Sequence, residues 1–266
     1  MLIATWNVNS VRARIPRIVD FCEKRQPDVL CMQETKVADE DFPADDLREI
    51  GYDVEFCGEK SYNGVAVASR LPMSVLTRGF DDGGGPDHAS RLLAVEVQPT
   101  PDHPRTPVPI VNTYVPQGKD PEHEAFRGKL DWLQRLRAFF DRHWTPRKRL
   151  LWVGDMNVAP EPIDIWEPER HLNHPDYHPD ARAAFAHTAE WGFVDCFRKH
   201  HPDAVEYTFY DYRDTRALEA GHGWRVDHIM ATTPLAALCT ETWIDLEPRT
   251  LEKPSDHTPL LAEFEF

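Results

Sequence analysis

The chain has 266 residues, a formal net charge of −15, 41% hydrophobic residues and 28% charged residues. This is ordinary for a globular protein, but the charge argues against a nonspecific polyanion binder, whose domain is usually strongly basic. No apolar run approaches the roughly 20 residues that span a bilayer, and the first residues predict a strand rather than a signal peptide, so we expect a cytoplasmic protein. Strand signals run along the whole chain without a linker, which predicts a single domain over residues 1–266.

The first part of the chain combines strands with two helices. Apolar spacing predicts a helix over residues 15–25, with Pro16 in its first turn. A second, shorter helix within residues 39–50 should end at Gly51. After Gly51 the strands follow one another without helices, which points to antiparallel meanders. The strands expected in this part cover residues 2–7, 29–33, 54–56, 65–68, 73–76 and 92–97.

The second part begins after a proline-rich stretch over residues 99–109, which we interpret as a surface connection because a strand at 108–112 follows at once. A glycine-rich loop at residues 83–86 lacks the Lys-Ser/Thr pair of a phosphate-binding loop. The clearest long helix covers residues 121–143, where aromatic and leucine side chains form one apolar stripe. A further helix is expected over 180–191, and further strands over 150–153, 226–231, 241–243 and 260–266. Two packed sheets flanked by helices fit this pattern better than a doubly wound parallel sheet.

Polar residues stand at or beside the ends of six of these strands. The run Leu150–Val153 predicts a strand buried on both faces, and Asp155 and Asn157 follow it. In extended backbone both side chains would point to the same side. The other strands lead to Asn7, Glu34, Tyr114, Asp227 and the pair Asp256-His257. One such strand end would be unremarkable, but six with complementary chemistry suggest one convergent polar site.

Three other groups of residues have more ordinary interpretations. The five cysteines are scattered with no CxxC pair, which favours buried thiols in a reducing compartment. His171, His174 and His178 suggest zinc, but no cysteine accompanies them and the prolines at 175 and 179 imply an irregular segment, so a loop at the edge of the site is favoured. A stretch with Arg12 and Arg14, together with Lys36, could form a local basic rim, although solvated surface charge explains these residues equally well.

Seven short motifs occur in one order along the chain: Trp6-Asn7-Val8-Asn9, Gln33-Glu34-Thr35-Lys36, Tyr62-Asn63-Gly64, Tyr114-Val115-Pro116-Gln117-Gly118, Gly154-Asp155-Met156-Asn157, Trp224-Arg225-Val226-Asp227 and Pro254-Ser255-Asp256-His257. Together they resemble the exonuclease III family of AP endonucleases, within the endonuclease/exonuclease/phosphatase superfamily. Each motif is weak alone, but the ordered set is specific and spans the chain. The resemblance implies an α/β fold of the DNase I-like type, a four-layer α/β sandwich with two packed, mainly antiparallel β-sheets flanked by helices.

The resemblance also implies a metal site. Glu34 matches the principal metal ligand of the family, and Asn7 and Asp256 would complete or support the site. Hard oxygen ligands suit Mg²⁺, with Mn²⁺ as a substitute, rather than zinc. The ion would act as a Lewis acid that stabilises the leaving 3′-oxygen.

Catalytic roles follow by matching position. Asp155 would orient or deprotonate the attacking water, and Asn157 would hold that water and a phosphate oxygen. His257 would bind the scissile phosphate, and Asp227 matches its partner acid in the family. Asp256 lies next to His257 in the chain, and adjacent residues in a strand point to opposite sides, so a direct bond between these two is less natural. Tyr114 would contact the phosphate as well.

The implied substrate is duplex DNA with abasic or 3′-blocked lesions. Phe209 and Trp224 match an aromatic wall that accepts an extruded abasic sugar, and Arg12, Arg14 and Lys36 are expected to contact DNA. The implied enzyme is a monomeric hydrolase of base excision repair that cleaves 5′ to abasic sites. It should also act as a 3′-to-5′ exonuclease and a 3′-phosphatase or phosphodiesterase.

Other functions within the superfamily remain as alternatives. DNase I-like nucleases and sphingomyelinases place a histidine where Tyr114 stands, and inositol phosphatases carry a cysteine that is absent beside Trp224. The acidic charge keeps open a phosphatase or phosphodiesterase acting on a small phosphate ester, which would need no basic rim. A catalytically inactive binding protein is disfavoured, because every expected site residue is present.

Overall fold

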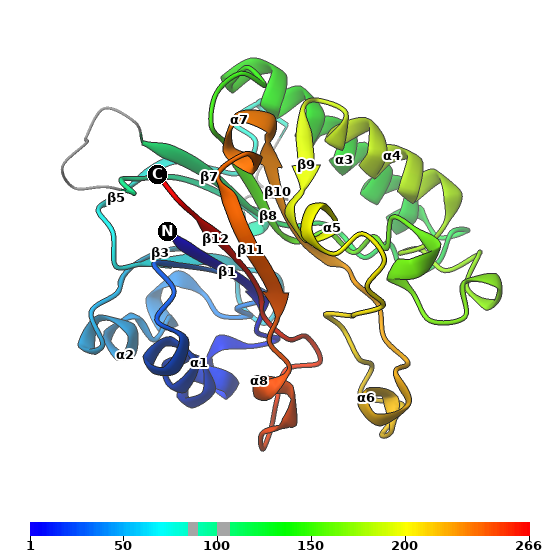
Figure 1. The fold of residues 1–266 in the computed structure, drawn as a ribbon, viewed down its shortest axis with the longest axis horizontal. Coiled ribbons are helices and arrows are strands. Elements are labelled where there is room, and N and C mark those ends of the chain that lie inside the picture. Colours follow the sequence, from blue (N-terminus) through cyan, green and yellow to red (C-terminus); the bar gives the residue numbers. More distant parts are fainter. Residues whose placement is uncertain (85–89, 100–106) are drawn as a thin grey trace.

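Two six-stranded β-sheets pack face to face in the computed structural model, which describes residues 1–84, 90–99 and 107–266 (Figure 1). One sheet has the order β11 (Cys239–Ile244), β12 (Leu260–Phe264), β1 (Leu2–Asn7), β2 (Val29–Gln33), β4 (Val65–Ser69) and β3 (Asp53–Cys57). The other has the order β5 (Met73–Arg78), β6 (Leu92–Val97), β7 (Val108–Tyr114), β8 (Leu151–Asp155), β10 (Asp227–Thr232) and β9 (Phe193–Asp195). The four-layer sandwich with mainly antiparallel sheets is thereby confirmed.

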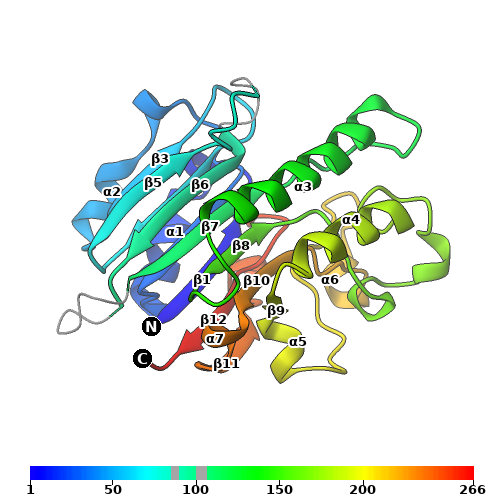
Figure 2. The same ribbon diagram turned by 90° about the horizontal axis from the view of Figure 1, so that it is seen from above.

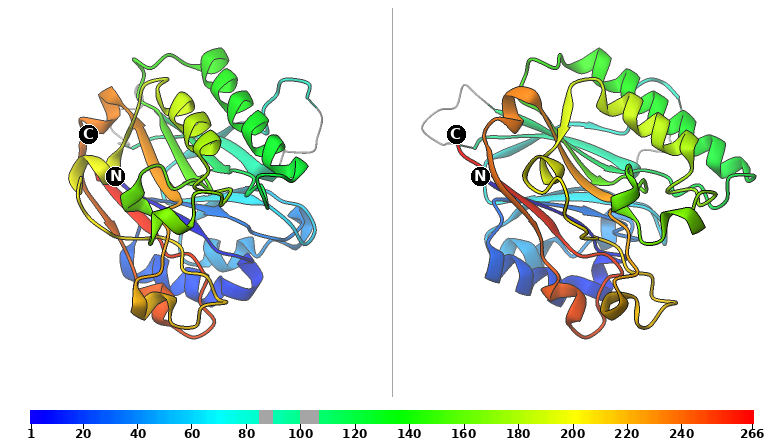
Figure 3. Two further views of the ribbon diagram at one scale, coloured as in Figure 1. Left: turned by 90° about the vertical axis from the view of Figure 1, so that its right-hand side faces the viewer. Right: turned by 45° about the vertical axis from the view of Figure 1, so that its right-hand side comes forward.

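Helices cover the outer face of each sheet. The first sheet is covered by α1 (Val11–Arg25) and α2 (Ala44–Glu49), and the second by α3 (Glu124–His143) and α4 (Pro179–Ala189) (Figures 2 and 3). Shorter helices occupy the connections: α5 (Cys196–His200), α6 (Ala217–Ala220), α7 (Thr233–Ala236), α8 (Glu247–Thr250), and the 3₁₀ turns η1 (Asp39–Asp41), η3 (Pro162–Asp164) and η4 (Pro168–Arg170). No helix in the described part of the chain is long and apolar enough to cross a membrane.

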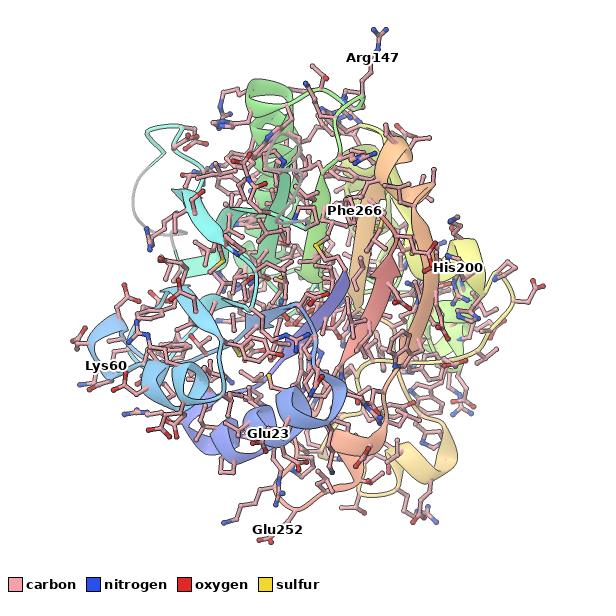
Figure 4. The ribbon with its side chains drawn as sticks, turned by 60° about the vertical axis from the view of Figure 1, so that its left-hand side comes forward. Glu23, Lys60, Arg147, His200, Glu252 and Phe266 are labelled. Atoms are coloured by element: carbon pink, nitrogen blue, oxygen red, sulfur yellow. The ribbon has the colours of Figure 1, made fainter. Side chains whose placement is uncertain are left out.

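Three apolar layers hold the sandwich together. Between the sheets, strand residues such as Ile3 and Val153 are fully buried. Outside them, Trp152 packs beneath the α3 residue Phe140, and Trp6 lies in the layer beneath α1. The central strands are therefore buried on both faces, which explains their nearly continuous apolar runs. Charged side chains such as Glu23, Lys60 and Arg147 extend outward (Figure 4).

The predicted start of the first helix was wrong. The helix begins at Val11 rather than residue 15, so Pro16 lies in its second turn rather than its first. The amide groups of Ser10 and Val11 donate to the carbonyl oxygens of Glu34 and Thr35, at 2.7 and 3.0 Å. This contact with a loop distant in sequence satisfies amide groups that the end of a helix otherwise leaves unpaired, and local apolar spacing could not reveal it.

The remaining expectations have mixed outcomes. All five cysteines are buried. The aromatic stretch over residues 207–212 makes only isolated bridges, from Phe209 to Trp224 and to His257. Of the proline-rich connection and the glycine-rich loop, residues 100–106 and 85–86 lie outside the described residues.

Sheet topology explains why the polar strand ends converge. Each sheet has one parallel pair at its centre, β1 with β2 and β7 with β8. Parallel strands bring their carboxyl ends to the same edge of a sheet. The antiparallel strand β10 adds its first residue there, because Asp227 pairs with Asp155. The two packed sheets therefore direct residues from five separated parts of the chain toward one site.

Candidate active site

Asp155 lies at the centre of the polar cluster. It ends β8 and is 1% exposed. Asn7 Nδ2 donates to Asp155 Oδ2 at 2.9 Å and to Glu34 Oε1 at 2.8 Å, so it bridges two carboxylates from different sheets. The backbone amide of Asn157 donates to Asp155 Oδ1 at 2.9 Å. The residue before Asp155 must be glycine, since a Cβ on Gly154 would lie 1.9 Å from the Thr113 carbonyl oxygen.

Glu34 is held in an unusual backbone conformation. Its φ of 52° lies in the left-handed region that residues other than glycine seldom adopt. The surrounding loop enforces it: the amide of Thr35 donates to the Gly64 carbonyl oxygen at 3.2 Å, and a Cβ on Gly64 would lie 1.9 Å from Thr35 Oγ1. Such conformations persist where neighbouring structure holds them, and they cluster at functional sites.

His257 pairs with Asp227 rather than with its chain neighbour Asp256. His257 Nδ1 lies 2.8 Å from Asp227 Oδ2, and its Nε2 faces Asp155 Oδ2 at 3.9 Å. Asp256 instead accepts a hydrogen bond from Asn9 at 2.9 Å. Burial disfavours the charged imidazole, but Asp227 and Asp155 outweigh burial and raise the pKa of His257 to about 10. The ring is therefore a cationic donor at neutral pH.

The surroundings of Asp155 also shift the pKa of its carboxyl group. Burial raises the pKa of its carboxyl group, the His257 cation opposes that rise, and the nearby Asp227 and Glu34 carboxylates add to it. A cation bound beside Asp155 would lower the pKa of the carboxyl group again, because a nearby opposite charge favours the ionised carboxylate.

Tyr114 is fixed by a residue that the sequence motifs did not single out. The guanidinium of Arg91 lies 4.6 Å from the Tyr114 ring centroid and donates to the Tyr114 carbonyl oxygen at 3.1 Å. Burial and the carboxylates of Glu34 and Asp155 raise the pKa of the Tyr114 phenol, so the hydroxyl stays protonated and can donate.

A cavity of about 420 Å³ opens beside this cluster. Phe209 and Trp224, the predicted aromatic wall, both line it. His174 lines it too and lies 4.3 Å from Trp224, while His171 lies 5.0 Å from Trp224, measured between ring centroids. The histidine-rich loop therefore borders the pocket, as expected. The other lining residues are Glu34, Tyr114, Gln117, Lys119, Asn157, Asp176, Asp211, Arg213, Val226, Asp256 and His257.

The residues fit a hard metal ion. Single ligand atoms of Glu34, Asp155 and His257 lie within 4.8 Å of one another. The raised pKa of His257 disfavours the neutral ring that a metal ligand needs, which leaves the partly buried carboxylate of Glu34 and the buried carboxylate of Asp155. Oxygen ligands of this kind are those that Mg²⁺ and Mn²⁺ prefer. Asp256, which was expected to complete or support the metal site, lines the pocket but is not part of this group.

The expected basic rim is largely engaged with the protein itself. Lys36 Nζ lies 2.6 Å from Glu34 Oε2, where it balances the carboxylate. Arg14 donates to the carbonyl oxygens of Asn9 and Pro254, and Arg12 lies 4.0 Å from Asp41. Of the three, Arg12 is the one exposed to solvent.

Sequence reasoning missed a buried polar bridge beneath the site. Gln33 Nε2 donates to Asn112 Oδ1 at 2.7 Å, and Asn112 Nδ2 donates to the carbonyl oxygens of Met32 and Ala66. This bridge links β2 and β4 to β7 in the facing sheet and so fixes the two halves of the site relative to each other. The signal in the sequence was the presence of two side-chain amides, Gln33 and Asn112, within otherwise apolar strands.

Replacing Asp227 with asparagine is expected to lower the pKa of His257 from about 10 by about 1–3 units. The pH dependence of stability follows from the raised pKa of His257. The protonated ring stabilises the fold fully at pH values below the pKa that histidine has in the unfolded chain. This stabilisation is lost as the pH rises through the pKa that His257 has in the folded protein. NMR titration of the His257 ring measures the shift. Asp256→Asn is the control, because Asp256 makes no direct bond to the ring; an equal shift in both variants would contradict the assignment.

Comparisons with known proteins agree with this geometry. The pattern of the Endonuclease/Exonuclease/phosphatase family matches residues 4–257. Exodeoxyribonuclease III of Haemophilus influenzae is 32% identical over 272 residues, covering 99% of this chain and 100% of that protein. An AP endonuclease structure from Archaeoglobus fulgidus is 44% identical with a TM-score of 0.94, and both chains are covered completely. A 3′ phosphatase from Neisseria, bound to product DNA hairpin, is 32% identical with a TM-score of 0.89, again over both whole chains. The chain therefore belongs to the endonuclease/exonuclease/phosphatase family, among relatives that are exodeoxyribonuclease III and AP endonucleases, as its ordered motifs predicted.

Proposed function

We propose that this protein is a divalent-metal-dependent DNA-repair phosphodiesterase that cleaves duplex DNA 5′ to abasic sites. The observation that carries the proposal is the group formed by the buried residues Asp155, His257 and Asp227 with the partly buried Glu34, which opens onto a cavity with an aromatic wall. The AP endonuclease and exodeoxyribonuclease III relatives support the same reaction class. By the same chemistry the enzyme would trim 3′-blocked ends as an exonuclease and a 3′-phosphatase.

Each side chain has a role that its surroundings suit. Asp155 positions a water molecule for in-line attack and takes its proton, with Asn157 beside it. The His257 cation and the Tyr114 hydroxyl stabilise charge that develops on the phosphate oxygens. Asp227 keeps His257 protonated and fixes its orientation.

The metal ion would be held by Glu34 with support from Asn7 and Asp256, and we propose Mg²⁺. When bound, it supplies Lewis-acid stabilisation of the leaving oxygen. Glu34 is suited to this role because it is partly buried and Asn7 fixes one of its oxygens.

The cavity suits a sugar that carries no base. Extruding an abasic nucleotide requires no base to be unstacked, so it costs less than extruding an intact one. Phe209 and Trp224 offer apolar surface without the hydrogen-bond pattern that reads a base. DNA contacts at Arg12, Arg14 and Lys36 complete the proposal, and for Lys36 they require release from Glu34. We propose that the protein acts as a monomer in the cytoplasm, where its buried cysteines would stay reduced.

The proposal is tested by incubating the protein with four labelled DNA substrates: a duplex with one synthetic abasic site, an undamaged duplex, a recessed 3′ end and a 3′-phosphate end. Cleavage of the abasic duplex with Mg²⁺, lost with EDTA, is the expected result, and the 3′ substrates measure the balance of activities. Folded protein that cleaves none of them but hydrolyses small phosphate esters would overturn the proposal.

A further inference from the structure

Lys129 is a fully buried lysine in the second turn of α3, on the helix face that packs on the sheet. Its Nζ lies within hydrogen-bond distance of four oxygens. Three are carbonyl oxygens, of Gln117 at 3.1 Å, Asn157 at 2.5 Å and Pro175 at 3.0 Å. The fourth is Asp176 Oδ1, at 3.0 Å. An ammonium group has three protons and accepts nothing, so a set made only of acceptors matches its protonated form.

The four oxygens belong to three segments that are separate in the chain. Gln117 follows β7, Asn157 follows β8, and Pro175 and Asp176 belong to the histidine-rich loop. Gln117, Asn157 and Asp176 all line the cavity beside Asp155, whereas Lys129 does not. The lysine therefore holds the lining segments from behind.

The cluster is closed by contacts among the same segments. Gln117 Nε2 lies 3.4 Å from both Asp176 carboxylate oxygens, and the amide of Ala159 donates to the Asp176 carbonyl oxygen at 2.8 Å. Asn157 has a left-handed φ of 48°, and Lys129 accounts for the direction of its carbonyl group. Burial lowers the pKa of Lys129, and the neighbouring Asp176 opposes that shift.

We infer that Lys129 is a positioning residue: it fixes Asn157, Gln117 and the His174–Asp176 segment relative to Asp155 without touching the substrate. The catalytic part of this inference rests on the proposed nuclease function. The structural part does not depend on that function, because it states only that Lys129 keeps three loops well ordered in the DNA-free protein.

The test compares Lys129→Met with Lys199→Met. Lys199 also donates to two carbonyl oxygens, of Ala236 and Cys239, but it lies on α5 and does not line the cavity. Hydrogen–deuterium exchange of the protein without DNA is expected to rise in all three loops for Lys129→Met, and in none of them for Lys199→Met. For incision of the abasic duplex, kcat should fall by about 10²-fold in Lys129→Met, because small misplacements of reacting groups cost that much. KM should change far less, since few substrate contacts are lost.

A second variant covers the case in which Lys129→Met fails to fold. Asp176→Asn removes one charge and leaves the three carbonyl contacts, so it should loosen the histidine-rich loop alone and reduce kcat less. Unchanged exchange in the three loops, or kinetics that match Lys199→Met, would overturn the inference. If the wild-type protein cleaves no DNA, the proposed function fails, and the exchange comparison still decides whether Lys129 orders the loops.

Discussion

Replacing Asp155 with asparagine is expected to lower kcat for incision of an abasic duplex by about 10²–10⁴-fold, the usual contribution of a general base. Asparagine has nearly the same shape and can still accept from the Asn157 amide, but it cannot take a proton. Single-turnover incision with saturating enzyme isolates the chemical step and measures the loss.

The stability of the same variant should move in the opposite direction. Burial raises the pKa of Asp155, so the folded protein binds a proton more tightly there than the unfolded chain does. The fold therefore loses stability as the pH rises from the unfolded-state pKa of Asp155 toward its higher folded-state pKa, and asparagine, which does not ionise, removes this loss. The thermal midpoint of Asp155→Asn at neutral pH should equal or exceed that of the wild type.

A buried acid outside the site provides the matched control. Asp245 is 7% exposed and pairs with Arg25 at 2.7 Å, so Asp245→Asn should lose stability and keep its incision rate. Asp155→Asn protein that retains more than a tenth of the wild-type rate would show that another group activates the water.

The positions of the site residues were readable from the sequence because they follow strong local signals. Asp155 and Asn157 come directly after a doubly buried strand, and a glycine marks the tight packing before them. The parallel pairs β1–β2 and β7–β8 then bring those strand ends together, which is a property of the fold rather than of any one motif. Sequence patterns thus supplied the residues and suggested that they converge, and the family resemblance supplied their roles.

What the sequence could not supply were contacts without a local pattern. Lys129 lies on the apolar face of a long helix, where one charged residue looks like a minor irregularity. Arg91 gives no sign of its position over Tyr114. The start of α1 depends on carbonyl groups of the Glu34 loop, and the pairing of Lys36 with Glu34 depends on the same loop. These features arise where segments distant in sequence meet, so periodicity and propensity carry no information about them.

Replacing Glu34 with glutamine is expected to raise the Mg²⁺ concentration for half-maximal incision by at least about tenfold, which corresponds to about 1.4 kcal/mol of lost binding free energy. The amide removes one of the two carboxylates of the group and leaves a poorer ligand for a hard cation. It also releases Lys36, whose positive charge then stays unbalanced next to the ion site. Both effects weaken cation binding, so the rate at saturating Mg²⁺ should fall as well.

Direct measurement of Mg²⁺ binding separates the loss of the ligand from other effects on the incision rate. Calorimetric titration of Mg²⁺ into the DNA-free protein should show binding that Glu34→Gln weakens. The control Glu55→Gln, which alters a half-exposed ion pair between β3 and Arg78 of β5, should leave it unchanged. Activity removed by EDTA should return with Mg²⁺ or Mn²⁺, because both are hard ions that carboxylates bind. An unchanged Mg²⁺ dependence in Glu34→Gln would place the ion elsewhere. Asp155, which belongs to the same group as Glu34, or Asp256, which lines the pocket, could then hold it. The variant Asp256→Asn would distinguish between them, since it leaves the proton acceptor intact.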